Sequence, residues 1–197
     1  MTNLIPDFVV RQINESIAVK EAMLNDAELI DVVESIAALI VETYRDGGKV
    51  LLAGNGGSAA DAQHIAAELV SRFAFDRPAL PAMALTTDTS ILTAISNDYG
   101  YDSLFSRQLE ASAKPGDVFI AISTSGNSPN IVRALETAND IGVVAVGLTG
   151  ATGGQMADLC RYCVNIPSTD TPRIQEGHIT IGHILCASTE QVLFGQD

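Results

Sequence analysis

Short apolar runs alternate with helical stretches along most of this chain, and this alternation constrains the fold more than any other feature. We expect strands at residues 50–53, 82–86, 118–123, 143–148 and 163–166, and helices at 58–73, 89–97, 129–141 and 174–194. The expected strands are rich in Val, Ile and Ala, which is typical of parallel strands buried on both faces. The sequence therefore predicts an α/β fold, a three-layer αβα sandwich with a five-stranded parallel sheet.

Two further helices precede the alternating part. Apolar residues recur at helical spacing over residues 6–24 and 29–45, and a pair of glycines ends the second stretch. The apolar stripe of each helix is wider than would be required to pack against one edge of a sheet. They could pack within the monomer, but we favour a helical bundle between subunits. We expect a single domain over 1–197, in which 1–46 is a helical oligomerisation segment and 47–197 is the α/β core.

The charge balance limits the partners of the chain. Its 197 residues carry 11 Lys and Arg against 24 Asp and Glu, a formal net charge of −13. Such an excess argues against nucleic acid and against anionic membrane surfaces, because both require clustered basic residues. No apolar run approaches the roughly 20 residues of a bilayer span, and the N-terminal segment lacks the pattern of a signal peptide. We therefore expect a cytoplasmic protein.

A glycine-rich loop, Gly54-Asn55-Gly56-Gly57-Ser58-Ala59, follows the first expected strand and opens a helix. It matches the dinucleotide fingerprint G-x-G-x-x-A, which also requires an acidic residue about 20 positions further on, at the end of the next strand. Asp76 has that spacing but precedes the next strand, which argues against an NAD site. Two interpretations remain. The glycines could allow tight strand–helix packing, or they could let backbone N–H groups approach an anion or a sugar hydroxyl.

A second loop, Ser123-Thr124-Ser125-Gly126-Asn127-Ser128-Pro129, also lies between an expected strand and a helix. Four hydroxyl groups, a glycine and a proline in the first helical turn favour a phosphate site at the helix N-terminus. A solvent-exposed polar turn is the alternative. Ligands of open α/β sheets lie at the carboxyl ends of the strands, where both loops fall.

Two helices carry candidate catalytic side chains. His64, Glu68 and Arg72 recur at i, i+4 spacing, so they form one slanted row that suits a metal, an acid–base pair or an ordinary surface ladder. The last helix contains Gln175, His178 and His183. The two histidines are offset by about 140° around the helix, so they do not share one site easily. A histidine on an apolar helix is more often a core residue.

The remaining motif is Cys160-Arg-Tyr-Cys163, a single C-x-x-C. Redox motifs of this kind open a helix, whereas this one leads into an expected strand. The chain has no second pair to complete a zinc site, so we interpret the thiols as buried side chains.

Four segments together resemble the phosphoheptose isomerases of the sugar isomerase (SIS) domain family. They are LLAGNGGSAADAQHIAAEL (51–69), LTAISNDYGYD (92–102), AISTSGNSPNIVRAL (121–135) and RIQEGHITIGH (173–183). The resemblance implies a flavodoxin-like SIS fold, a cytoplasmic homotetramer and zinc at the active site. It also implies an aldose–ketose isomerase that converts sedoheptulose 7-phosphate to D-glycero-D-manno-heptose 7-phosphate for lipopolysaccharide or capsule.

The resemblance also assigns residues to roles. Zinc would be held by His64, Glu68, Gln175 and His183, and Glu68 and His183 would form the acid–base pair. The sugar phosphate would contact the following residues, together with Glu68: Asn55, Gly56, Gly57, Asn97, Asp98, Ser123, Thr124, Ser125, Ser128 and Gln175. Some relatives have an acidic residue where this chain has Pro172, so the role of that carboxylate is not carried over to this chain.

Two alternatives stay open at this point. A group of similar SIS proteins is non-catalytic, forms tetramers and binds the replication-initiator protein, but its members lack the Glu and the second His that are present here as Glu68 and His183. A different sugar-phosphate isomerase or a sugar-binding regulator would share the phosphate loop. The complete pair favours an enzyme over the non-catalytic group, because enediolate chemistry needs a base and an electrophile. Only substrate profiling separates the second alternative.

Overall fold

The computed structural model describes residues 4–195, with side chains from residue 7 onward. Five parallel strands form one sheet: β1 (Val50–Gly54), β2 (Ala82–Ala84), β3 (Val118–Ile122), β4 (Val144–Gly150) and β5 (Tyr162–Ile166). The helices are α1 (Leu4–Leu24), α2 (Ala27–Arg45), α3 (Gly57–Val70), α4 (Thr89–Tyr99), α5 (Ser106–Ser112), α6 (Pro129–Ile141) and α7 (Thr171–Phe194). Two short 3-10 helices, η1 (Tyr101–Ser103) and η2 (Gly154–Met156), lie in the connections.

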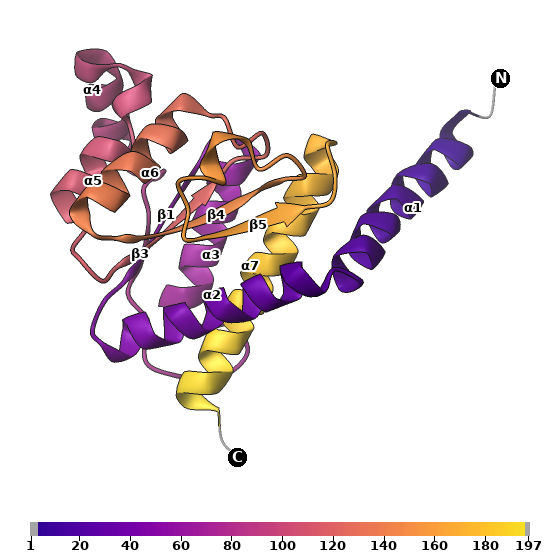
Figure 1. Cartoon of the computed structure of the whole chain (residues 1–197), viewed down its shortest axis with the longest axis horizontal. Coiled ribbons are helices and arrows are strands. Elements are labelled where there is room, and N and C mark those ends of the chain that lie inside the picture. Colours follow the sequence, from indigo (N-terminus) through magenta and orange to yellow (C-terminus); the bar gives the residue numbers. More distant parts are fainter. Residues whose placement is uncertain (1–3, 196–197) are drawn as a thin grey trace.

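The sheet has the strand order β2-β1-β3-β4-β5, which is the flavodoxin-like order. Helices cover both of its faces (Figure 1). One face packs against α2, α3 and α7 through residues such as Leu52, Ile120 and Leu148. The other face packs against α5 and α6 through Phe119 and Ala121 among others. The predicted three-layer αβα sandwich with a five-stranded parallel sheet is therefore confirmed.

The central strands are short apolar runs for a physical reason. β1 and β3 are buried over their whole length, because helices cover both sides of each strand. Alternate residues then serve the two faces of the sheet, so Leu52 and Leu51 belong to different apolar cores. The outer strand β2 is only three residues long and pairs with β1 alone.

Some elements differ from the sequence expectation. The helix expected to reach residue 73 ends at Val70, since the following backbone turns away to hydrogen bond with α7. The strand expected to reach residue 86 ends at Ala84. Helix α5 was not predicted, because only Leu109 is both apolar and buried within its seven residues.

The first helix extends away from the sandwich (Figure 1). It contacts α2 and α7 near its C-terminal half, where the Ser16 hydroxyl donates to Glu176 at 2.6 Å. Large apolar side chains on α1 are about half exposed, among them Val10, Ile13 and Ile17. No helix within residues 4–195 is both long and apolar enough to span a membrane.

Candidate active site

The two loops singled out in the sequence lie side by side at the carboxyl ends of β1 and β3. Gly54 pairs with Ile122 in the ladder, so Asn55 and Ser123 leave neighbouring strands at the same level. From β1 the chain first adds β2 on one side and then adds β3, β4 and β5 on the other, so the carboxyl ends of β1 and β3 form the topological switch point of the sheet. Ligands of open α/β sheets bind at such a point.

Asn55 ties the glycine loop to its surroundings. Its side-chain amide exchanges two hydrogen bonds with the amide of Asn130 in the first turn of α6, both at 2.9 Å. The Tyr101 hydroxyl donates to the Asn55 Oδ1 atom at 2.8 Å. Gly56 has a φ of 56°, a left-handed conformation that favours glycine and turns the chain into α3. The glycine loop is thus fixed against α6 and against the segment that follows α4.

The serine loop, Ser123 to Ser128, presents hydroxyl and amide groups at the N-terminus of α6. The hydroxyls of Ser123 and Ser128 hydrogen bond to each other at 2.9 Å, and Gly126 adopts a φ of 66°. Among the described residues, no acceptor takes the backbone N–H groups of Thr124, Ser125 or Ser128. Free N–H groups beside hydroxyls at a helix N-terminus form a favourable site for a phosphate group.

Helices α3 and α7 pack closely along one face of the sheet and run in the same direction (Figure 1). Gln175 lies against Gly57 at one end of the pair, and Gly182 lies against Ile65 further along. A Cβ at Gly182 would come within 2.6 Å of the Ile65 Cδ1 atom, so a glycine is needed for this close approach. The contact brings the middle of the two helices together.

His64, Glu68 and His183 meet where the two helices approach. The Nε2 atoms of His64 and His183 lie 2.9 Å apart, although the residues are 119 positions apart in the sequence. The Glu68 Oε1 atom lies 3.5 Å from His64 Nε2, and the Glu68 side chain is 25% exposed. The cluster is therefore open to a small molecule while its members hold one another in place.

Asp61 and Phe73 belong to the same cluster, and the sequence analysis missed both. Burial raises the pKa of Asp61, while the neighbouring His64 and His183 lower it. The Oδ2 atom of Asp61 is buried with no hydrogen-bond partner among the described residues. The Phe73 ring packs on the His183 ring with centroids 5.6 Å apart. Asp61 precedes His64 by three residues and lies on the same face of α3. This spacing was the signal in the sequence that Asp61 lies near the cluster.

The cluster also fits the donor set of a zinc ion. No group of three or more His, Cys, Asp or Glu side chains within residues 4–195 is already arranged as a metal site. Two ligands of a tetrahedral zinc lie about 3.3 Å apart, so His64 and His183 would need to separate by only a few tenths of an ångström. Glu68 is already at about that spacing from His64. The unpartnered Asp61 oxygen could orient a ligating imidazole.

Other residues that the sequence singled out lie apart from this cluster. Gln175 is two helical turns before His183 on α7, beside the glycine loop. Asn97 and Asp98 are exposed on α4 and hydrogen bond to each other at 2.8 Å. Arg72 lies just beyond α3 and forms no ion pair with Glu68 among the described residues. The site within one chain thus has two parts, a phosphate-type edge at the two loops and a His–Glu cluster further along α3.

His178 takes no part in either. Its side chain is fully buried, and the Nε2 atom lies 3.1 Å from the carbonyl oxygen of Thr149. Burial lowers the pKa of His178 to about 4, in spite of the hydrogen bond to Thr149. The expectation of a core histidine is confirmed at this position.

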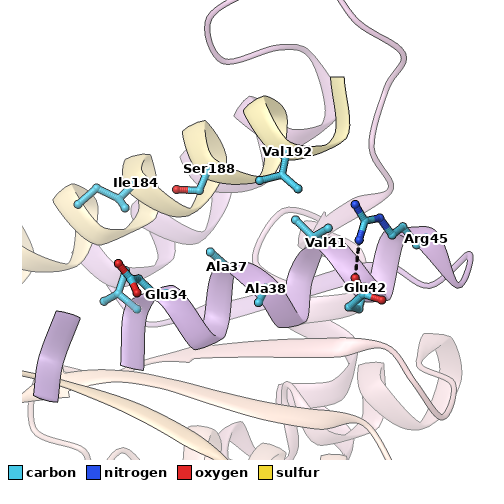
Figure 2. A pocket seen from close by; sticks show the side chains of 10 residues that line it. Glu34, Ala37, Ala38, Val41, Glu42, Arg45, Ile184, Ser188 and Val192 are labelled. Carbon is cyan, nitrogen blue, oxygen red and sulfur yellow. Dashed lines mark hydrogen bonds and ion pairs between the residues drawn. The ribbon is translucent and has the colours of Figure 1, made fainter. Parts of the chain in front are cut away.

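A groove lies away from these loops, between α2 and α7. Figure 2 shows Ala37 and Val41 of α2 facing Ile184 and Val192 of α7 across it, and Ala38 also lines the groove. Its volume is about 360 Å³, and its lining is mostly apolar with Glu34, Glu42 and Arg45 at the margins. An apolar groove without convergent polar groups is better suited to another apolar surface than to a sugar phosphate.

Comparison with known proteins gives the family. The SIS domain family matches residues 14–150. The chain is 64% identical over 188 residues to phosphoheptose isomerase from Aneurinibacillus thermoaerophilus, an alignment that covers 95% of each. It belongs to the phosphoheptose isomerase family.

Solved structures of phosphoheptose isomerases agree with this membership. The enzyme from Neisseria gonorrhoeae superposes with a TM-score of 0.88 at 41% identity, covering 94% of this chain and 98% of that one. The enzyme from Francisella tularensis superposes with a TM-score of 0.91 at 36% identity, covering 97% and 100%. The shared fold extends past the SIS match to α7, which carries His183.

Proposed function

We infer that this chain is a phosphoheptose isomerase that converts sedoheptulose 7-phosphate to D-glycero-D-manno-heptose 7-phosphate in heptose biosynthesis. One observation carries this conclusion within the family. His64 and Glu68 of α3 meet His183 of α7 at an accessible point, with the two Nε2 atoms 2.9 Å apart. A binding scaffold has no need of an imidazole pair beside a carboxylate, whereas an isomerase uses such a group for proton transfer.

The chemistry requires a base near two adjacent carbons. Glu68 removes a proton from the carbon beside the carbonyl group, which gives an enediolate. Glu68 then returns the proton to the former carbonyl carbon. His183 donates to the oxygen that gains negative charge. The Phe73 ring packs against the His183 ring and restricts its rotation.

The phosphate end of the substrate is bound at the other part of the site. Ser123, Thr124, Ser125 and Ser128 offer hydroxyl groups, and the α6 N-terminus contributes the favourable end of its dipole. Asn55, Gly56, Gly57, Asn97, Asp98 and Gln175 are proposed to contact the sugar. Neither loop contains Lys or Arg, so the strongly acidic net charge does not prevent binding, because local dipoles recognise the phosphate.

We propose one zinc ion per subunit, held by His64, Glu68 and His183, with a fourth ligand from Gln175 of a neighbouring subunit, because Gln175 of the same chain lies two helical turns from His183 beside Gly57. Support comes from the spacing of the first three side chains and from the buried Asp61 oxygen nearby. When bound, the ion would polarise the carbonyl oxygen of the substrate as a Lewis acid. A ligated carboxylate is less basic, so Glu68 acts as the base only to the extent that it is released from the metal.

We also propose that the chain works as a cytoplasmic homotetramer, with residues 1–46 as the oligomerisation segment of a single SIS domain. The half-exposed apolar face of α1 and the groove between α2 and α7 support self-association. The His64 and Glu68 side chains are partly exposed in one chain, so a neighbouring subunit can cover the cluster that they form with His183.

A substrate assay tests the assignment directly. Purified protein is incubated with sedoheptulose 7-phosphate, and the aldose is followed by NMR with and without a chelator, alongside elemental analysis. We expect aldose formation that falls after chelation and recovers with added zinc. Absence of turnover on this ketose would overturn the function, whereas full activity without bound zinc would remove only the metal.

A further inference from the structure

Cys160 and Cys163 bring their thiols together over a glycine on the α6 side of the sheet. Cys163 of β5 pairs with Gly147 of β4, and Cys160 lies in the turn just before β5. A Cβ at Gly147 would be 2.8 Å from the Cys160 Sγ atom and 3.0 Å from the Cys163 Sγ atom. Both sulfur atoms therefore occupy the space that any side chain at Gly147 would take.

The two thiols differ from the third cysteine of the chain. Cys186 is buried with 2% exposure, whereas Cys160 and Cys163 are half-buried. The expectation that the thiols of Cys160 and Cys163 are buried is therefore met only in part. Hydrogen bonding from the Cys160 thiol lowers the pKa of Cys163, and the same contact together with burial raises the pKa of Cys160. This asymmetry makes Cys163 the more reactive of the two toward oxidants.

We propose that Cys160 and Cys163 form an oxidation site that closes reversibly to a disulfide under hydroperoxides. The Cys163 thiolate attacks the peroxide, an S–O bond forms, the O–O bond breaks and hydroxide leaves. The Cys160 sulfur then attacks the Cys163 sulfur, the S–S bond forms, and the hydroxyl group leaves as water with the Cys160 proton. The two thiols are oxidised by two electrons and the peroxide is reduced. A dithiol reverses the reaction by exchange.

The position of the pair links it to the serine loop. The Met156 Cε atom also borders the Gly147 position, at 3.3 Å from the Cβ that a side chain there would have. The Met156 N–H donates to the Gly126 carbonyl oxygen at 3.1 Å, and the Gln155 N–H donates to the Asn127 Oδ1 atom at 3.0 Å. The η2 segment therefore packs against both the thiols and the serine loop. A disulfide would restrict this segment and reduce opening of the loop.

Thiol counting tests the chemistry. After hydrogen peroxide treatment and denaturation, we expect free thiols to fall from three per chain to one, with a Cys160–Cys163 cross-link found by mass spectrometry and three thiols restored by dithiothreitol. In Cys160→Ser, Cys163 should stop at sulfenic acid, which dimedone traps. In Cys163→Ser, Cys160 should stay reduced. Three thiols remaining in the treated wild type, or cross-links between chains instead, would overturn the proposal.

Hydrogen–deuterium exchange tests the link to the loop. The peptide covering residues 123–129 should exchange more slowly in the oxidised wild type than in the reduced protein. The Cys160→Ser variant treated in the same way should show no slowing. Equal exchange in the oxidised and reduced wild type would refute the coupling. Neither measurement involves turnover, so both outcomes are independent of the isomerase assignment.

Discussion

Gly54 and Gly57 lie three residues apart in the glycine loop, yet a methyl group would meet a different obstacle at each. At Gly54 it would come within 2.5 Å of the Ser58 carbonyl oxygen, which belongs to the rigid start of α3. At Gly57 it would collide with the side-chain amide of Gln175, which can rotate away. The first glycine therefore serves the fold and the second the position of Gln175.

We expect Gly54→Ala to lower the melting temperature by about 6 °C, since overpacking of this kind costs about 2 kcal/mol. Gly57→Ala should leave the melting temperature within about 2 °C but raise KM several-fold, because Gln175 is displaced from the site. Calorimetry and kinetics on both variants provide the check. The reverse pattern would show that the two glycines have been assigned to the wrong roles.

Ser128 offers a second test at the residue scale. Ser128→Ala removes a hydroxyl at the α6 N-terminus, and a hydrogen bond to a charged group contributes about 1.5–3 kcal/mol. We expect KM for the sugar phosphate to rise about tenfold or more, while kcat changes little. Thr137→Ala, two turns further along α6, is the matched control and should leave KM unchanged. An unaltered KM in Ser128→Ala would exclude this hydroxyl from phosphate binding.

Residue types at helical spacing made His64, Glu68 and His183 visible in the sequence, but not their meeting point. Their contact depends on the approach of α3 and α7 at Gly182, which lies outside any local pattern. Asp61 was missed because an acidic residue on an amphipathic helix is usually an exposed one. Phe73 was missed because it was assigned to the helix, whereas it lies in the following turn.

At the element scale, a buried ion pair fixes the end of α3 to α7. The side chains of Arg77 and Glu190 are each 1% exposed and lie 2.9 Å apart. Glu190 also accepts from the backbone N–H groups of Phe73, Ala74 and Phe75. Arg77 donates to the carbonyl oxygen of Glu68 at 2.8 Å, so the pair caps the helix that carries the proposed base.

Glu190→Gln should lower the melting temperature by about 10 °C at pH 7, because Arg77 would be left buried without its counter-charge. Burial raises the pKa of Glu190, but the three N–H groups and Arg77 outweigh burial and lower it. The ionised form therefore stabilises the fold above the ordinary Glu pKa of about 4.3 and loses this effect as the pH falls.

The difference in melting temperature between wild type and Glu190→Gln should accordingly shrink between pH 7 and pH 3. Glu136→Gln, on the exposed side of α6, is the control and should have little effect at either pH. A difference that stays constant with pH would show that ionisation of Glu190 does not stabilise the fold.

The ion pair between Arg77 and Glu190 also explains why the sequence predicted some element boundaries better than others. Strands β1 and β3 were located because burial on both faces leaves an unbroken apolar run. Helix α6 was located at both ends, because Pro129 marks its start and Gly142 its end. The end of α3 was misplaced, since it is set by Arg77 and by the distant Glu190 rather than by a local stop signal.

At the scale of the whole molecule, the exposed apolar face of α1 leads to a prediction about assembly. A double variant, Ile13→Glu with Ile17→Glu, places two charges on side chains that are 55% and 48% exposed in the single chain. We expect the wild type to be a tetramer by analytical ultracentrifugation and this variant to dissociate at micromolar concentration. Arg107→Glu makes the same net charge change on α5 and should remain tetrameric.

A monomeric wild type would contradict the proposed tetramer, whatever the variants do.

The alternation of strands and helices was sufficient to predict the layered fold, because the pattern of apolar residues depends on which side chains are buried within a single chain. It does not test the proposed assembly, since the surfaces proposed to cover α1 belong to other subunits. The acidic net charge likewise argues against large anionic partners but not against a small phosphate, which we propose is bound by local dipoles.

The central claim is that Glu68 moves the proton in the isomerisation, and solvent exchange tests it most directly. Wild type and Glu68→Gln are each incubated with sedoheptulose 7-phosphate in D2O, and the aldose is examined by NMR for deuterium at the carbon next to the aldehyde. We predict deuterated aldose from the wild type, a loss of at least about 100-fold in Glu68→Gln, and an unchanged circular dichroism spectrum. Near-wild-type isomerisation by a folded Glu68→Gln variant would contradict the account.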